Sequence, residues 1–550
     1  MTTKEPNGKP KLPTQQLAIL AVARIAEPMA YTSVFPYLPS MIKSFGIKQN
    51  KVARWAGITS GAFSVAQSTT AVAWGKASDI YGRKPTIIAG LLSTMVCCVV
   101  WGMSSSLPMA ITIRAIQGGS NGNVGIIRTM VAEMVPEREL QPRAFSIMPL
   151  VWSLGSVLGP SFGGFFAEPA KQFPSVFGEI EFFKRFPFAL PNLILTIFFL
   201  ISTTCATLFL HETLPSKRGH RGWGLLAGDR IVRLFKRTPP TPSHRRRSFV
   251  DGEATAPLLP NKAASNTHSP RHGENEKVFT RQTVINLVAY TFLAFHSVAY
   301  DQTLSVFLNY PVQEHTPENF KPPFYFSGGF GLEPGQIGTI FTLYGIVCGV
   351  IQFLLYPPFV TRFGVLRCFR VCCLIMPLAY FLTPYCVLFP TQKTRLAALL
   401  VVMFLKAAAI IVAFPSTTIL LTNSCTSVRV LGTMNGYATT FSGIGRALGP
   451  ASTGAMFTWG VDNGYVVSAW FYLTIAAILG AFPVYMIVEG QGPNASVDES
   501  DTEDGESSSS STLLLPDDSA LASGSEDESC RPSSKRSQQQ SYGTINGERN

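Results

Sequence analysis

Charge is scarce in this 550-residue chain, in which only 14% of the residues are Asp, Glu, Lys or Arg. A soluble protein of this length would divide into several domains and carry charge throughout. Here long uncharged runs alternate with short, strongly polar stretches. Each run reaches the roughly 20 residues that a membrane helix needs. The sequence therefore excludes a soluble protein and indicates one that crosses a membrane many times.

Several chemical signatures are also missing. The ten cysteines lie mostly within the apolar runs and lack the spacing of a metal site, so we interpret them as small packing residues. The sequence has no phosphate-binding loop and no nucleophile–base set. We therefore expect no enzyme, no cofactor and no metal site. The net charge of +12 does not indicate nucleic acid, because the basic residues lie in loops that flank the apolar runs.

The apolar runs predict an all-α membrane protein with twelve spans in two groups of six. The N-terminal bundle covers 15–210 and the C-terminal bundle covers 281–488. We expect the basic linker 211–280, the N-terminal tail 1–14 and the acidic, Ser-rich tail 489–550 to be disordered. The predicted spans are 15–41, 56–77, 85–106, 108–131, 143–167, 188–210, 282–308, 334–360, 366–389, 395–421, 430–457 and 464–488.

The two groups of six spans resemble each other, which indicates a duplication. The pattern Gly155-x-x-x-Gly159-Pro160 in the fifth span has a counterpart, Gly445-x-x-x-Gly449-Pro450, in the eleventh. Two such halves are typical of transporters that open a central site to each side of the membrane in turn. Because the linker is overwhelmingly basic, we expect it and both termini to lie in the cytoplasm.

One short loop between the second and third spans has the pattern G-x-x-x-D-x-x-G-R-K, from Gly75 to Lys84. Gly82 permits a left-handed backbone, Asp79 can accept hydrogen bonds at a helix end, and Arg83 with Lys84 anchors the next helix on the basic side. A generic basic loop is the plainer interpretation. These offsets resemble the first-half loop of the major facilitator superfamily, which implies its twelve-helix fold and no enzymatic activity.

Motifs in the first and fifth spans resemble those of a particular branch of this superfamily. The first span, with Arg24-Ile25-Ala26-Glu27-Pro28, resembles the zinc-induced-facilitator-like branch of the drug:proton antiporter group, which is related to tetracycline exporters. Zinc-related transport is not inherited, because the Cys- and His-bearing motifs of the plant members are not recognisable here. The fifth span resembles the motif that marks antiporters rather than symporters, through Gly155, Gly159, Pro160 and Gly163.

Few ionisable groups interrupt the spans, and each costs several kcal/mol unless it is paired or hydrated. Arg24 and Glu27 share one helix face, so they either form a titrating group for proton coupling or simply neutralise each other. Arg114 resembles the arginine of the superfamily's fourth-span motif, which is linked to proton transfer, although a structural arginine is an alternative. The candidates for the lining of a substrate cavity are Gln117, Asp301, Lys406 and Arg446.

The sequence thus predicts a proton-coupled antiporter that exports a small organic molecule or drug, driven by the proton gradient. We expect a monomer in the plasma or vacuolar membrane whose partners are the substrate, protons and lipid. The resemblance implies that Asp79 meets the start of the eleventh span, near Gly432, in the outward-facing state. The alternatives are a nutrient symporter or uniporter, for instance for a sugar, and a receptor or scaffold that does not transport.

Overall fold

The computed structural model describes residues 12–135, 140, 144, 147–214, 217, 224–228, 230, 279–314, 316, 320–425 and 428–490. The chain divides into two compact units, Met1–Ser496 and Val497–Asn550, and all described residues belong to the first. Most of the predicted linker and the predicted tail from residue 491 onward lie outside the described residues.

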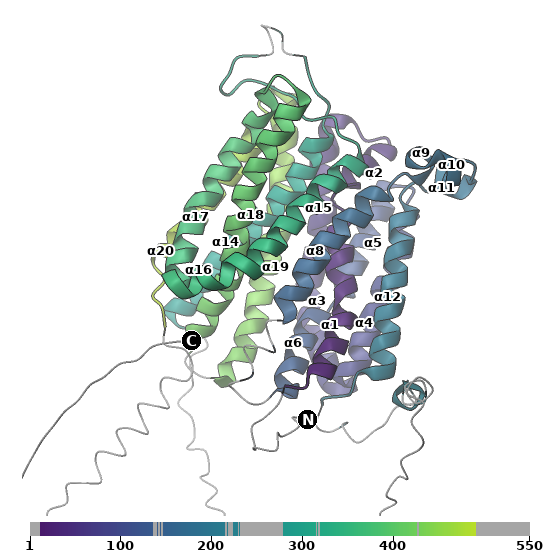
Figure 1. Ribbon diagram of the computed structural model, residues 1–550, viewed down its shortest axis with the longest axis vertical. Coiled ribbons are helices and arrows are strands. Elements are labelled where there is room, and N and C mark those ends of the chain that lie inside the picture. Colours follow the sequence, from purple (N-terminus) through teal and green to yellow (C-terminus); the bar gives the residue numbers. More distant parts are fainter. Residues whose placement is uncertain are drawn as a thin grey trace, which may run out of the picture. The chain divides into compact units, whose positions relative to one another are not determined.

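The first half of the chain forms six spanning segments (Figure 1). Short helices at the end opposite the N-terminus join the fifth segment to the sixth. These are α9 (Pro169–Gln172), α10 (Pro174–Phe177) and α11 (Glu181–Arg185). The spanning segments are α1 (Thr14–Thr32) with α2 (Leu38–Ser44), α3 (Val52–Tyr81), α4 (Arg83–Gly102), α5 (Leu107–Gly119) with α6 (Asn123–Met134), α8 (Ile147–Phe165) and α12 (Ala189–Phe209).

The second half forms six more segments. The eighth includes a π-helical turn at Ile351–Leu355, and the ninth ends in a 3₁₀ stretch at Thr383–Leu388. The segments are α14 (Arg281–Asn309), α15 (Pro334–Val350) with α16 (Tyr356–Phe363), α17 (Val365–Leu382), α18 (Gln392–Asn423), α19 (Val428–Asp462) and α20 (Ser468–Tyr485). Among the described residues each predicted span overlaps one of these helical segments, so the predicted all-helical fold in two groups of six is confirmed.

Helix ends follow from local side chains. Thr280 and Thr283 form a reciprocal cap at the start of α14, and Thr391 and Thr394 form the same cap at the start of α18. Each cap satisfies backbone N–H groups that a helix start leaves without a partner. The fourth span differs from its prediction, because the chain leaves the helical conformation at residues 120–122 and divides the span into α5 and α6.

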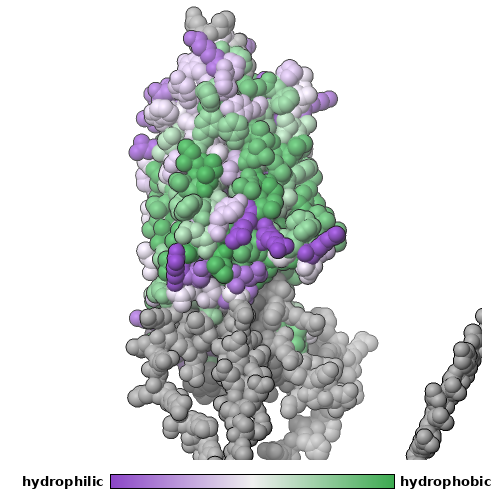
Figure 2. All heavy atoms as spheres, turned by 90° about the vertical axis from the view of Figure 1, so that its left-hand side faces the viewer, coloured by the Kyte–Doolittle hydropathy of each residue, from purple (hydrophilic) through white to green (hydrophobic). Residues whose placement is uncertain are grey.

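The apolar surface is consistent with a bilayer. Within the described residues, seven helical segments are long and apolar enough to cross a membrane by composition alone. Figure 2 shows one flank, on which apolar side chains cover the middle and hydrophilic ones gather toward both ends. On α17 and α20, Leu374 and Phe482 are 62% and 70% exposed, as side chains that face lipid would be.

The two halves meet along α3 with α19 and along α8 with α15. Several hydrogen bonds between them lie near Asn50, whose amide donates to Asp462 Oδ1 at 2.6 Å. The Arg54 N–H donates to Thr458 Oγ1 at 3.3 Å nearby. We call this the Asn50 end and the opposite one the Asp79 end. Polar contacts therefore join the halves at the Asn50 end, and Arg128 Nη1 of α6 also donates to Thr439 Oγ1 of α19 at 3.3 Å toward the Asp79 end.

Glycines let helices approach closely in both halves. A Cβ atom at Gly155 would lie 2.6 Å from the Pro28 side chain, so α8 packs directly on α1. In the second half a Cβ atom at Gly449 would lie 2.3 Å from the carbonyl oxygen of Phe295, so α19 packs on α14 in the same way. The close packing that the repeated glycine pattern predicts is thus present twice.

Candidate functional site

The first buried charge pair lies within α1. The Arg24 guanidinium donates to Glu27 Oε2, and the two residues are only 8% and 5% exposed. A third group completes the site, because the Asn123 amide donates to Glu27 Oε1 at 2.5 Å. The structure therefore brings Arg24 and Glu27 together as predicted, with both carboxylate oxygens bonded. Inside a low-dielectric protein, a charged carboxylate is stable only when its oxygens have hydrogen-bond or ion-pair partners.

Asn123 is a residue that the sequence analysis missed. It is the first residue of α6, directly after the break in the fourth span, and it is fully buried. Gly90 makes room for it, since a Cβ atom there would lie 2.4 Å from the Asn123 side-chain oxygen. The sequence signal that could have identified Asn123 is its position, as an amide residue next to a glycine-rich stretch. A helix that breaks at such a stretch exposes polar groups.

The glycine face of α8 packs along the helix that carries Glu27. Gly159 lies against Thr32, where a Cβ atom would be 2.1 Å from Oγ1, and Gly163 lies against the Ser33 carbonyl at 1.9 Å. Pro160 lies within the same helix, where it removes one backbone donor. Because interiors are close-packed, a displacement of α8 must also move α1 or separate the two helices.

Arg114 lies apart from that pair. It is 2% exposed and donates from Nη1 to Gln117 Oε1 at 2.6 Å. Its guanidinium carbon lies 5.1 Å and 5.2 Å from the ring centres of Phe63 and Trp101. Gln117 is itself buried and also donates to Cys98. In the described part of the chain, no ion pair links Arg114 to a carboxylate, and its Nε has no hydrogen-bond partner.

A second charge pair joins α14 to α18. Lys406 Nζ donates to Asp301 Oδ1 at 2.6 Å, and its ammonium lies 5.0 Å and 5.1 Å from the rings of Tyr300 and Tyr344. The Lys406 side chain is 1% exposed and that of Asp301 is 27% exposed. Two residues predicted separately as cavity candidates therefore form one pair, with the carboxylate on its open side.

Arg446 of α19 has neither an ion pair nor a hydrogen bond among the described residues, although it is only partly exposed. Its Nη2 atom lies 3.9 Å from the position that a Cβ atom at Gly443 would take, and Ser68 Oγ of α3 lies 1.9 Å from the same position. The Arg446 guanidinium therefore lies near the contact between α19 and α3.

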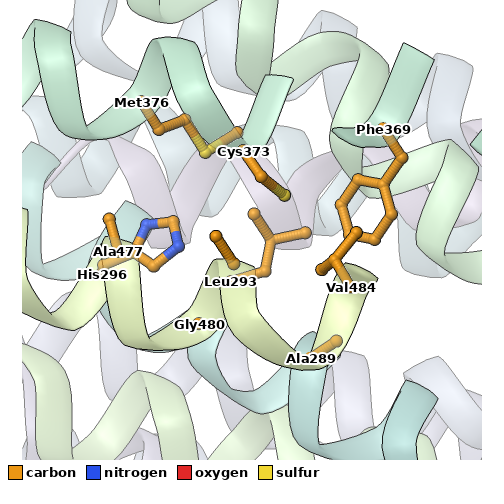
Figure 3. A pocket seen from close by; sticks show the side chains of 10 residues that line it. Ala289, Leu293, His296, Phe369, Cys373, Met376, Ala477, Gly480 and Val484 are labelled. Atoms are coloured by element: carbon orange, nitrogen blue, oxygen red, sulfur yellow. The ribbon is translucent and has the colours of Figure 1, made fainter. Parts of the chain in front are cut away.

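A small cavity lies inside the second half (Figure 3). His296, Cys373 and Met376 line it from α14 and α17, and His296 Nδ1 lies 2.9 Å from the Tyr380 hydroxyl. Its volume of about 10 Å³ holds about one water molecule. This cavity is too small for an organic substrate.

The predicted loop pattern folds into an ionic cluster at the Asp79 end. Arg83 Nη1 pairs with Asp79 Oδ1 at 2.5 Å, and Arg83 Nη2 pairs with Glu133 Oε1 at 3.0 Å. Glu212, just after α12, accepts hydrogen bonds from the backbone N–H groups of Arg83 and Lys84 at 2.9 Å and 3.0 Å. A carboxylate thus caps the start of α4, where the helix dipole favours negative charge.

Glu133 and Glu212 were absent from the predicted site, because they lie 50 and 129 positions from Arg83. Lys84 also donates to the Thr207 carbonyl at 2.8 Å. Gly75 has open space around it. The predicted partner of Asp79, near Gly432, belongs to a stretch of α19 whose side chains are not described.

The sequence pattern of the Major Facilitator Superfamily matches residues 20–315 and 292–521. A multidrug transporter of this superfamily from Aspergillus fumigatus, mfsB, is 36% identical over 511 residues, which cover 87% of this chain and 84% of the relative. The chain therefore belongs to the major facilitator superfamily. It is also similar to ZINC INDUCED FACILITATOR-LIKE 1 of Arabidopsis thaliana, at 27% identity over 81% of this chain and 84% of the relative.

Solved structures share the fold. The crystal structure of a D-xylose-proton symporter superposes with a TM-score of 0.57 at 13% identity, covering 87% of this chain and 98% of the other. That of the human organic anion transporter MFSD10 gives 0.53 at 18% identity, with coverage of 86% and 100%. As a member of this superfamily, the chain is a multi-pass membrane transporter and not an enzyme.

Proposed function

We propose that this protein is a proton-coupled antiporter that exports a small organic molecule by alternating access. The observation that carries the proposal is the buried Arg24–Glu27–Asn123 site on α1, against which the glycines of α8 pack. A carboxylate between a guanidinium that lowers its proton affinity and an apolar interior that raises it can change protonation when its surroundings change. The relatives named as multidrug and tetracycline resistance proteins support the export direction.

In this mechanism, protonation of Glu27 removes its negative charge and weakens its bonds to Arg24 and Asn123. Arg24 then lies buried without the counter-charge with which it is paired in this structure. Asn123 stands at the start of α6, and the break at residues 120–122 connects it to the helix that carries Arg114. A shift of Asn123 therefore reaches Arg114 through one short backbone segment, although the two charged side chains do not touch.

We place the termini and the linker in the cytoplasm, in either the plasma or the vacuolar membrane, and the protein acts as a monomer. The hydrogen bonds of Asn50 and Arg54 then lie on the outer side. On the inner side, Asp79 pairs with Arg83. In the outward-facing state it would cap the start of α19 and hold the inner side closed.

The sign of proton movement tests this proposal. The full chain is reconstituted in liposomes that contain a pH-sensitive dye, and a panel that includes tetracycline and cationic, neutral and anionic aromatic compounds is added outside. An antiporter accumulates its substrate in acid-loaded vesicles, and their lumen becomes more alkaline as protons leave. A symporter acidifies the lumen on substrate addition instead. Vesicles without protein and vesicles with a protonophore are the controls, and a chain that moves no compound would contradict transport.

A further inference from the structure

The charges between the two halves do not balance. Arg24 is neutralised by Glu27, and Lys406 is neutralised by Asp301. Arg114 and Arg446 have no carboxylate partner among the described residues. An uncompensated cation inside a membrane protein is costly unless a negative charge or water meets it. Two such cations, one from each half, therefore favour an anion that the described part of the chain does not supply.

Both cations lie beside α3. The Arg114 guanidinium carbon lies 5.1 Å from the Phe63 ring, and Arg446 Nη2 and Ser68 Oγ lie 3.9 Å and 1.9 Å from the position that a Cβ atom at Gly443 would take. The Tyr31 ring lies 5.6 Å from that of Phe63 and 5.8 Å from that of Trp152, which is 44% exposed. Aromatic rings of this kind provide a flat apolar contact surface. The site therefore combines excess positive charge with aromatic surface.

An apolar groove lies beside these cations. It encloses about 440 Å³ between α3, α5 and α19, which is within the usual range for a small-molecule site. Val65 and Leu448 on its walls are 51% and 57% exposed, so the groove opens toward lipid. Ala115 and Ala447 also line it. Ala115 directly follows Arg114, and Ala447 directly follows Arg446. Because successive residues of a helix are rotated by about 100°, each guanidinium leaves its helix about 100° around from the groove wall.

We propose that the transported substrate is an amphipathic organic anion. Its negative group pairs with Arg446 in the field of Arg114, and its apolar part lies along the groove of α3 and α19. This inference rests on the proposed transport function and specifies its substrate class. A cation would be repelled by the two arginines, and a neutral analogue would leave their charges unmet.

A matched pair of ligands tests the class. Naphthalene-2-sulfonate carries a permanent negative charge, so a pH gradient alone does not concentrate it, and naphthalene-2-sulfonamide has nearly the same shape without the charge. In acid-loaded proteoliposomes of the full chain, we expect the sulfonate to be transported about tenfold faster than the sulfonamide. Binding of both compounds to the purified chain, measured by equilibrium dialysis, should show the same preference.

Arg446 provides the residue-level test. Arg446→Gln should reduce the ratio of sulfonate to sulfonamide transport rates to about one. Arg446→Lys should restore most of the ratio, because the positive charge returns. Ala62→Leu would fill the groove and should raise the KM for the sulfonate. Ala89→Leu, on the exposed face of α4, is the matched control and should leave KM unchanged.

Two results would overturn this inference. One is an unchanged preference in Arg446→Gln. The other is a parent chain that transports the sulfonamide, or the cation 2-naphthylmethylammonium, in preference to the sulfonate. In both cases antiport itself stands, provided that some compound still moves against protons. If no compound of the wider panel moves with the pH gradient, the proposed function fails and the substrate class fails with it.

Discussion

The two halves share a scaffold but carry their buried charges differently. In the first half Arg24 and Glu27 lie three positions apart on one helix, and Asn123 closes the site. In the second half Asp301 and Lys406 come from two helices, and the carboxylate stays partly exposed. The Arg24–Glu27 ion pair crosses no helix interface, so titration of Glu27 alters the contact between helices only at its hydrogen bond with Asn123. A pair between helices also holds them together, so we assign coupling to the first half and cohesion of α14 and α18 to the second.

The loop at Gly82 in the first half and the corresponding loop at Gly364 in the second half share a backbone conformation but differ in their charged groups. Gly82 and Gly364 both adopt positive φ, at 106° and 83°. A Cβ atom at Gly82 would lie 2.6 Å from Glu212 Oε2, whereas nothing lies within 4 Å of one at Gly364. Thr361 occupies the position that would correspond to the acid in the first loop, and its hydroxyl donates to the Pro357 carbonyl. The duplicated turn has kept its backbone, but only the first copy has its carboxylates.

Among variants that distinguish the two halves, we expect the largest effect on stability from a substitution of Asp301. Asp301→Asn leaves the buried Lys406 ammonium without a counter-charge, which should cost about 3 kcal/mol of stability. Thermal unfolding of the purified chain in detergent measures this loss. The double variant Asp301→Asn with Lys406→Met removes both charges and should recover most of the midpoint. If the double variant unfolds at the same temperature as Asp301→Asn alone, the ion pair does not hold α14 and α18 together.

A smaller difference is expected between the two loop glycines. Gly82→Ala and Gly364→Ala share the backbone strain of positive φ, about 1 kcal/mol each. Only Gly82→Ala also displaces Glu212 from the start of α4, so only this variant should reduce transport, by about threefold. Initial transport rates, normalised to protein in the vesicles, provide the measurement. Equal rates for the two variants would remove the distinction between the loops.

Much of this architecture could be predicted because its causes are local. Uncharged runs of membrane length identify the spans, and glycines at helical spacing predict that α8 packs closely on another helix. The pairing of Arg24 with Glu27 follows from their offset on one helix. These features depend on residues within a few helical turns of one another.

What could not be predicted depends on distant contacts. Asp301 and Lys406 lie 105 positions apart, and Asn123 lies 96 positions from Glu27. Nothing in either local pattern selects the partner, since any polar group that the packing brings close would serve. The break at residues 120–122 was missed because glycines in a membrane helix are also compatible with uninterrupted packing.

The assignment of coupling to Glu27 has one direct test. Glu27→Gln keeps a side chain of nearly the same shape but cannot release or take up the proton, so the variant should still exchange labelled for unlabelled substrate across the membrane. It should lose accumulation driven by a pH gradient, whereas the double variant Asp301→Asn with Lys406→Met should retain it. Gradient-driven accumulation by Glu27→Gln at the parental level would contradict the account.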